Sequence, residues 1–383
     1  MTYKSFKYKG VIVMDTHTSI PNDLQKLFSD WLLHIRSRDP ESANQIKTKI
    51  DKVLEVKESN IDYLLLDARH HILLKDYTNA QVILEKLKKG FSRLSNQQKY
   101  YYYLFNGDLF YCVGRYDNAL HNYLEAGSFL NGISNEIEHA EYHYRIGTQY
   151  FQLGYASSSV SHAEKAYKIF IDHKEYTKRA YDCKVLLALS YTDMHNYQVA
   201  ASLYEELAEY CEDIDNPEYK MGIYRNLGIL YSIQGKVEDA IEQFKMSVSH
   251  SIREEDILPS YYLLSEELFK AGENYEALEI LNKGLELANE VKNETFIYRF
   301  LILKGKYVKK ELKEESYLKG IMYFKEKQLY DFVEKYSIEL GDLYFAKGEY
   351  KNAVEYYRLA KESRDKFSTR SKIFYIGGIH NEK

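Results

Sequence analysis

Two consecutive segments decide the fold: VLLALSYTDMHNYQVAASLYEELAEY at residues 185–210 and YRNLGILYSIQGKVEDAIEQFKMSVSH at residues 224–250. In each segment a small residue is followed three positions later by a tyrosine, and then by a break at His195-Asn196 or Gly235. A second small residue and an aromatic residue come after the break. Small residues let two antiparallel helices approach closely, while the aromatic side chains fill the space beside them. The segments therefore predict two successive helical hairpins.

The break and the small residue that follows it recur along the chain, always five positions apart. The pairs are Gly114/Ala119, Gly154/Ser159, His195/Ala200, Gly235/Ala240, Gly272/Ala277 and Gly348/Ala353. A weaker unit with Gly305 and Tyr317 fills the interval before the last pair. The small residues step by roughly forty positions, more than the thirty-four of the common tetratricopeptide repeat. We expect an all-α protein in which residues 96–383 form about seven tetratricopeptide hairpins, wound into a right-handed superhelix.

The region before the repeats also has helical periodicity. Residues 1–20 are expected to form an N-terminal extension, and residues 21–95 a helical bundle. Its last two helices already resemble a repeat, with Ala68 and Ala80 at the small positions. The expected helices start at Pro21, run from Pro40 to about Lys57 with Asp39 as N-cap, from Ile61 to Lys75, and from Thr78 to Leu94.

The composition is typical of a folded, water-soluble protein, with 45% hydrophobic residues, 28% charged residues and only four prolines. A net charge of -5 gives no sign of a basic surface that would bind nucleic acid. The apolar run Val11–Met14 is too short for a signal peptide or a membrane span. Cys112, Cys183 and Cys211 are far apart within helical patterns, which fits reduced thiols. We expect a cytoplasmic protein with no direct nucleic-acid or membrane partner.

An array of helical hairpins has no intrinsic chemistry, so its function depends on the side chains that line its concave face. The first helix of each hairpin faces this side, and Asp193 and Asn226 are polar residues on two consecutive first helices. An asparagine side chain can both donate to and accept from a peptide backbone, which suits an extended peptide. Their clustering favours a peptide site over a merely solvated face. The other candidates at first-helix positions are Tyr144, Thr148, Gln152, Leu189, Arg225, Ile229, Glu339 and Asp342.

Other kinds of site find little support in the sequence. His139 and His143 are four residues apart on one helix face, but no third metal ligand stands at a matching position. The acidic segment CEDIDNPEY at residues 211–219 lacks the glycine and closing glutamate of a calcium loop, and Asn216-Pro217 predicts a helix start instead. There is no glycine-rich phosphate loop. We expect neither a metal nor a cofactor.

Several segments are similar to the Rap family of Bacillus-type bacteria, the response-regulator aspartate phosphatases and their relatives governed by short secreted Phr peptides. These are DWLLHIRSRDPESA (30–43), LLLDARHHILL (64–74), EIEHAEYHYRIGTQYFQLGYASSSVSHAEKAYKIF (136–170), the segment YRNLGILYSIQGKVEDAIEQF within 224–250, and QLYDFVEKYSIELGDLYFAKGEYKNAVEYY (328–357). They cover nearly the whole chain in the family's order. The resemblance implies a short helical domain followed by repeats that bind a peptide.

The resemblance also implies roles for individual residues. Asp193 and Asn226 match the Asp and Asn with which the family anchors the peptide backbone. Leu301 stands where the family has an acidic residue, a difference that bears on how basic the accepted peptide is. Phosphatase members carry a Glu-Asp-Gln-Asp run whose Gln orients the attacking water. The corresponding stretch here, VLEVKESNIDYLLLDARHH (53–71), is about four residues shorter and has no Gln, so Asn60 is the conceivable substitute.

Two functions remain open at this point. In the first, the protein is a quorum-sensing regulator that binds a short secreted peptide and sequesters a response regulator or transcription factor, or removes its phosphate. In the second, it is a peptide-independent repeat scaffold for protein assembly. The pair of Asp193 and Asn226 favours the first, because a scaffold needs no polar anchors there. A DNA-binding relative is disfavoured, because residues 1–95 show no short basic helix-turn-helix.

Overall fold

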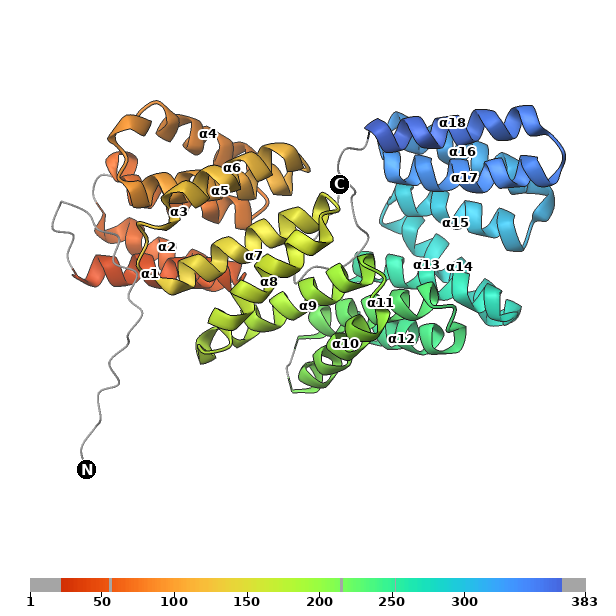
Figure 1. Cartoon of the computed structure of the whole chain (residues 1–383), viewed down its shortest axis with the longest axis horizontal. Coiled ribbons are helices and arrows are strands. Elements are labelled where there is room, and N and C mark those ends of the chain that lie inside the picture. Colours follow the sequence, from red (N-terminus) through yellow and green to blue (C-terminus); the bar gives the residue numbers. More distant parts are fainter. Residues whose placement is uncertain (1–21, 55–56, 214–215, 252, 367–383) are drawn as a thin grey trace. The chain divides into compact units, whose positions relative to one another are not determined.

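The computed structural model describes residues 22–54, 57–213, 216–251 and 253–366. Over these residues the chain forms eighteen α-helices and four short 3-10 helices, and it contains no strand (Figure 1). The predicted all-α class is confirmed. In the part of the chain that the structure describes, no helix combines the length and the apolar character needed to span a membrane.

The first four helices are α1 (Asn22–Arg36), α2 (Pro40–Val53), α3 (Ile61–Leu73) and α4 (Tyr77–Lys88). The last three of these end earlier than the sequence predicted. Asp39 caps α2 as expected, because its carboxylate accepts from Ser42 N at 3.0 Å. The chain leaves α2 at Leu54, which is extended, and a separate 3-10 turn, Lys57–Ser59, precedes α3. After α4, Gly90 interrupts the helix and the 3-10 turn Phe91–Arg93 follows, since glycine has low helix propensity.

The remaining fourteen described helices pair into seven hairpins, the number that the sequence predicted. They are α5 (Asn96–Cys112) with α6 (Tyr116–Leu130), α7 (Glu136–Gln152) with α8 (Ala156–Phe170), α9 (Thr177–Asp193) with α10 (Tyr197–Glu212), α11 (Pro217–Ile233) with α12 (Val237–Ser249), α13 (Glu254–Ala271) with α14 (Asn274–Glu290), α15 (Glu294–Tyr307) with α16 (Lys313–Glu326), and α17 (Tyr330–Ala346) with α18 (Tyr350–Lys366). Two further 3-10 turns, Lys174–Tyr176 and Lys310–Leu312, precede α9 and α16.

Every predicted break carries a residue with left-handed backbone. The φ angle is +57° at His195, +73° at Gly235 and +84° at Gly272. A left-handed residue ends one helix and reverses the chain, and glycine adopts this conformation without steric cost. The breaks therefore act as turns, as the sequence predicted. The other three breaks share the conformation: Gly114, Gly154 and Gly348.

Two further left-handed residues, not predicted from the sequence pattern, have the same spacing to a buried alanine. Arg38 and Lys75 have φ angles of +57° and +60°, and each precedes a fully buried alanine, Ala43 or Ala80, by five residues. The spacing is that of the repeats, but arginine and lysine are not usual residues for this conformation. The α1–α2 and α3–α4 pairs thus share the turn of the later hairpins.

Close contact between small residues and aromatic rings stabilises several of the hairpins. Ala200 and Ala240 are fully buried, as are the aromatic residues Tyr204 and Phe244 one turn later. A β-carbon built on Gly228 of α11 would lie 2.6 Å from the Phe244 ring of α12. Only a residue without a side chain allows the two helices to pack at this separation. The packing inferred from the sequence is therefore observed.

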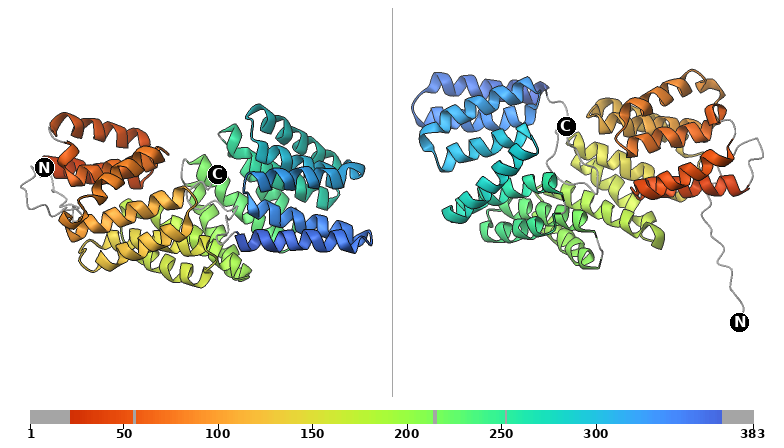
Figure 2. Two further views of the ribbon diagram at one scale, coloured as in Figure 1. Left: turned by 90° about the horizontal axis from the view of Figure 1, so that it is seen from above. Right: turned by 180° about the vertical axis from the view of Figure 1, so that it is seen from behind.

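The chain divides into two compact units. The first contains the residues up to Phe151 together with Ser157–Cys183, and the second contains Gln152–Ala156 and the chain from Lys184 onward. The division falls within α9. In the two views of Figure 2 the helices of the second unit, green to blue, follow one another as stacked hairpins, in agreement with the contacts of α12 with α13 and of α16 with α17. The boundary at residues 95/96 stays a prediction.

The α11–α12 packing generates a stability prediction. Gly228→Ala places a methyl group against the Phe244 ring, so we expect the free energy of unfolding to fall by about 1–3 kcal/mol through overpacking. Urea denaturation followed by circular dichroism measures this change. Gly132→Ala is the control, because its β-carbon would meet nothing closer than a carbonyl oxygen at 3.5 Å. Equal stability of both variants would contradict the account of hairpin packing.

Candidate functional site

The residues predicted to bind a peptide all lie on the first helices of hairpins. Asp193 ends α9, and Asn226 lies in the middle of α11. Within the second unit, α11 contacts α13 and α13 contacts α15, so successive first helices are direct neighbours. The placement predicted from the sequence is thus observed, while the role of these residues in peptide binding stays a prediction. The other candidates are on α7 (Tyr144, Thr148, Gln152), α9 (Leu189), α11 (Arg225, Ile229) and α17 (Glu339, Asp342).

Asp193 and Asn226 differ in exposure. The Asp193 side chain is half-buried at the carboxyl end of α9, whereas Asn226 is fully buried beside Tyr204 of α10. Burial raises the pKa of the Tyr204 hydroxyl far above its usual value, and hydrogen bonding to Asn226 partly offsets this effect. The pair therefore combines a half-buried carboxylate with a buried amide that lies beside a tyrosine of the preceding hairpin.

The apolar and basic candidates near this pair are mostly buried. Leu189 lies one turn before Asp193 and is fully enclosed. Ile229 is half-buried and packs against the core formed by α12, α13 and α14. Arg225 is 6% exposed. These three side chains support the position of the polar pair and offer little free surface of their own.

The two candidates on α17 make contacts within their own unit. Glu339 accepts a hydrogen bond from Tyr317 Oη at 2.6 Å and pairs with Lys306 Nζ at 3.1 Å. Asp342 is exposed and accepts from Tyr357 Oη at 2.7 Å. Both carboxylates thus join α17 to α15, α16 or α18, and a peptide that used them would have to share these donors.

The α7 candidates are enclosed by neighbouring helices. Arg179 of α9 covers the Tyr144 ring at 4.1 Å, and burial raises the pKa of Tyr144 to about 12. Thr148 is buried and donates to the Tyr144 carbonyl at 2.9 Å. Gln152 is also buried. A neighbour that the sequence reading missed, Gln149, donates to the Tyr116 carbonyl at 2.9 Å and fastens α7 to α6.

Asn60, the candidate for catalysis, is the N-cap of α3. Its side-chain oxygen accepts from Tyr63 N at 2.8 Å. A capping role accounts for an asparagine at this position without any catalytic function. The amide oxygen that would orient a water is therefore already engaged with the backbone. Nearby, Lys57 pairs with Asp51 at 3.1 Å.

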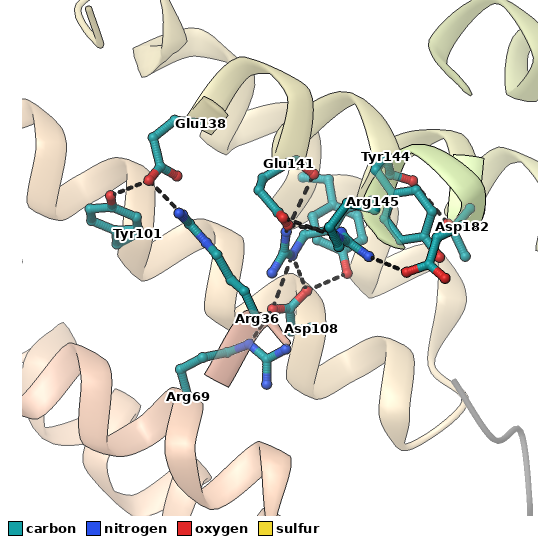
Figure 3. Close-up of polar contacts among 12 residues, drawn as sticks. Arg36, Arg69, Tyr101, Asp108, Glu138, Glu141, Tyr144, Arg145 and Asp182 are labelled. Carbon is teal, nitrogen blue, oxygen red and sulfur yellow. Dashed lines mark hydrogen bonds and ion pairs between the residues drawn. The ribbon is translucent and has the colours of Figure 1, made fainter. Parts of the chain in front are cut away.

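The largest cluster of charges is a buried ion network in the first unit, and the sequence reading did not predict it (Figure 3). At its centre Glu141 of α7 pairs with Arg145 of the same helix and with Arg179 of α9, the latter at 2.9 Å. Arg179 also pairs with Asp182 at 3.0 Å. Burial alone would raise the pKa of Glu141, but Arg179 and Arg145 hold it well below its usual range. Glu141 is therefore charged.

Two further carboxylates extend the network to the first helices of the chain. Asp108 of α5 pairs with Arg69 of α3 and Arg145 of α7, both at 2.9 Å. Glu138 of α7 pairs with Arg36 of α1 at 2.5 Å and accepts from Tyr101 Oη at 2.8 Å (Figure 3). The network thus links α1 and α3 to α5, α7 and α9. Glu138, Glu141 and Arg145 recur at helical spacing in EIEHAEYHYR, which is the one sign of it in the sequence.

Comparison with known proteins tests these expectations. The family model described as "Tetratricopeptide repeat" matches residues 258–291 and 335–367, which include α14 and α18. Among curated proteins, the Bacillus subtilis regulatory protein RapG is 26% identical over 67% of this chain and 72% of its own length. Response regulator aspartate phosphatase E of the same species is 27% identical over 71% of this chain and 76% of its own length. These matches support the predicted resemblance to the Rap family.

Other relatives extend the comparison to function and fold. The transcriptional activator NprA of Geobacillus stearothermophilus is 28% identical over 70% of this chain and 67% of its own length. The apo quorum sensor NprR from B. thuringiensis superposes with a TM-score of 0.76 at 21% identity, covering 89% of this chain and 99% of its own. A Rap protein complexed with competence and sporulation factor gives 0.74 at 20% identity, covering 91% and 99%. The two structures therefore share the fold of this chain.

The ion network yields a stability prediction. Glu141→Gln leaves two buried guanidinium groups without their shared carboxylate, so we expect the free energy of unfolding at neutral pH to fall by about 3–5 kcal/mol. The pKa of Glu141 is depressed in the folded state, so its contribution is present above the ordinary value of 4.5 and is lost as pH falls below it. Urea denaturation at several pH values should show that Glu141→Gln lacks this pH-dependent contribution to the free energy of unfolding.

Glu279→Gln provides the matched control. Glu279 pairs with Lys283 one turn away, and both side chains are about half exposed, so we expect a loss below about 1 kcal/mol. If Glu141→Gln cost no more than this control, the network would not stabilise the first unit.

Proposed function

We propose that this protein is a Rap-type quorum-sensing regulator that binds a short signalling peptide across the first helices of its repeats. The observation that carries the proposal is the presence of Asp193 and Asn226 on the consecutive first helices α9 and α11, at the positions where the family's peptide anchors stand. The related Rap protein of similar fold was solved with competence and sporulation factor bound.

Peptide binding follows from the chemistry of this pair. Asn226 offers one acceptor and two donors, and Asp193 offers acceptors, so together they can satisfy the N–H and C=O groups of an extended backbone. Anchors that read the backbone fix the register of a peptide, while its side chains determine which sequence is accepted. Leu301, which is 38% exposed on α15, presents an apolar surface where the family has a carboxylate. We therefore propose that the accepted peptide does not depend on a basic side chain at that point.

The proposed partner is a response regulator or a transcription factor, controlled by sequestration. Relatives with the names of response regulator aspartate phosphatase and transcriptional activator support a regulatory partner. Removal of phosphate from the partner is the less favoured activity, because the family's Gln is missing and the Asn60 amide oxygen is engaged in capping. A peptide-independent scaffold is the alternative that the binding experiment tests.

The peptide site is tested by calorimetry with synthetic peptides that match the carboxyl ends of small secreted precursors encoded beside the gene. Asp193→Ala and Asn226→Ala should each weaken the binding peptide by about 1–3 kcal/mol, which is the cost of leaving a backbone polar group without its partner. Asn118→Ala, at an exposed position of α6, is the control and should bind as wild type does. Equal affinity of all four proteins would remove the pair from the site, and no binding at all would favour the scaffold.

The catalytic part has its own test. A phosphorylated response regulator incubated with the protein should lose its label no faster than alone, because the amide oxygen of Asn60 is engaged in capping α3. If dephosphorylation does occur, Asn60→Asp distinguishes a catalytic role of the amide from its capping role, because aspartate can still cap α3 but has no amide. Rapid loss of label that Asn60→Asp abolishes would overturn the proposal that sequestration is the only activity.

A further inference from the structure

An open cavity of about 470 Å³ lies at the α7–α8 hairpin of the first unit, apart from the residues assigned to the peptide. Cavities of roughly 300–1,000 Å³ are typical of small-molecule sites. Its lining comes from the segment before α7 and from facing turns of α7 and α8: Ser134, Glu136, His139, His143, Lys165, Lys168 and Ile169.

The charges around the cavity are unbalanced. Lys165 and Lys168 project from successive turns of α8, are exposed, and form no ion pair with any residue in the described part of the chain. Glu136 is the only carboxylate of the lining, and it accepts from His173 Nε2 at 3.1 Å. Two cationic side chains therefore face the cavity without a counter-ion.

Three histidines add to this surplus of nitrogen donors. His139 donates from Nε2 to the Ile133 carbonyl at 2.7 Å, which leaves its Nδ1 as the remaining site for a proton. His143 and His162 bring their Nδ1 atoms to 2.9 Å of each other, so only one of the two can carry a proton there. Burial, followed by His162, Lys165 and His139, lowers the pKa of His143 to about 4. No carboxylate opposes these effects.

We propose that this cavity binds a tetrahedral oxyanion of the phosphate type, either free phosphate or the phosphoryl group of a small molecule. The ammonium groups of Lys165 and Lys168 neutralise its charge, and the imidazoles of His139 and His143 donate hydrogen bonds to its oxygens. The hydroxyl of Ser134 at the rim supplies a further donor. The bound anion balances the positive charge of the two lysines, which have no counter-ion in the described part of the chain.

Anion binding at this site takes up protons. A negative charge stabilises the imidazolium form, so it raises the pKa of His143 and His162. The groups that face this pair are His139, Tyr142 and Tyr150 from α7 and Lys165 from α8, and none is a carboxylate. Affinity for sulfate, whose own charge is constant, should therefore rise as the pH falls from about 8 to about 6.

The test is calorimetry on the full chain at constant ionic strength, with inorganic phosphate, glycerol phosphate and sulfate as probes. The double variant Lys165→Ala/Lys168→Ala should weaken all three by at least about tenfold, as expected from the loss of two close charges. Lys351→Ala/Lys361→Ala, at exposed positions of α18, is the matched control and should leave the affinities unchanged. Circular dichroism verifies that both double variants are folded.

The outcomes separate the ligand sources. Equal affinity for phosphate and glycerol phosphate assigns the site to the free anion, and tighter binding of glycerol phosphate assigns it to a phosphorylated small molecule. Carbon-attached proton signals of His139, His143 and His162 should shift on saturation in either case. Absence of saturable binding, or equal weakening by the control variant, would overturn the proposal. Neither result depends on whether the peptide binds at Asp193 and Asn226.

Discussion

The close approach of paired helices is the constraint on which the rest of the structure depends. Gly228 packs against Phe244, and the left-handed turn at Gly235 lets the chain reverse within a few residues. Because a hairpin cannot bury its apolar faces alone, each one needs its neighbours. This requirement places first helices side by side and brings Asn226 and Asp193 onto consecutive elements.

The first unit depends on a second interaction, the ion network around Glu141. Desolvating four carboxylates and four arginines would be unfavourable if any were left unpaired. Instead each carboxylate pairs with at least one arginine, and the network joins α1 and α3 to α5, α7 and α9 (Figure 3). Buried charges of this kind accept few alternative arrangements, so they specify the packing of these helices as well as stabilising it.

Local chemistry decides what the sequence could predict. Glycine breaks and buried alanines have short-range signatures, so the seven hairpins and the Asp39 cap were predictable. The turns at Arg38 and Lys75 were not, because tertiary packing imposes left-handed backbone on residues that do not prefer it. The ion network could not be predicted from the sequence, because it joins residues such as Arg36 and Glu138 that are far apart in the chain. The sequence suggested Asn60 as a catalytic residue. Its role as the N-cap of α3 is seen only in the structure.

In the candidate site, too, some features could be predicted from the sequence and others depend on tertiary packing. Which helices carry its residues was predictable from periodicity, but the burial of Tyr144 beneath Arg179 was not. The central claim is that a peptide engages α9 and α11. Hydrogen exchange measured with and without saturating peptide tests it most directly. The account predicts slower exchange in α9 and α11, with α4 and α18 unchanged. Protection confined to other helices, or none at saturation, would contradict it.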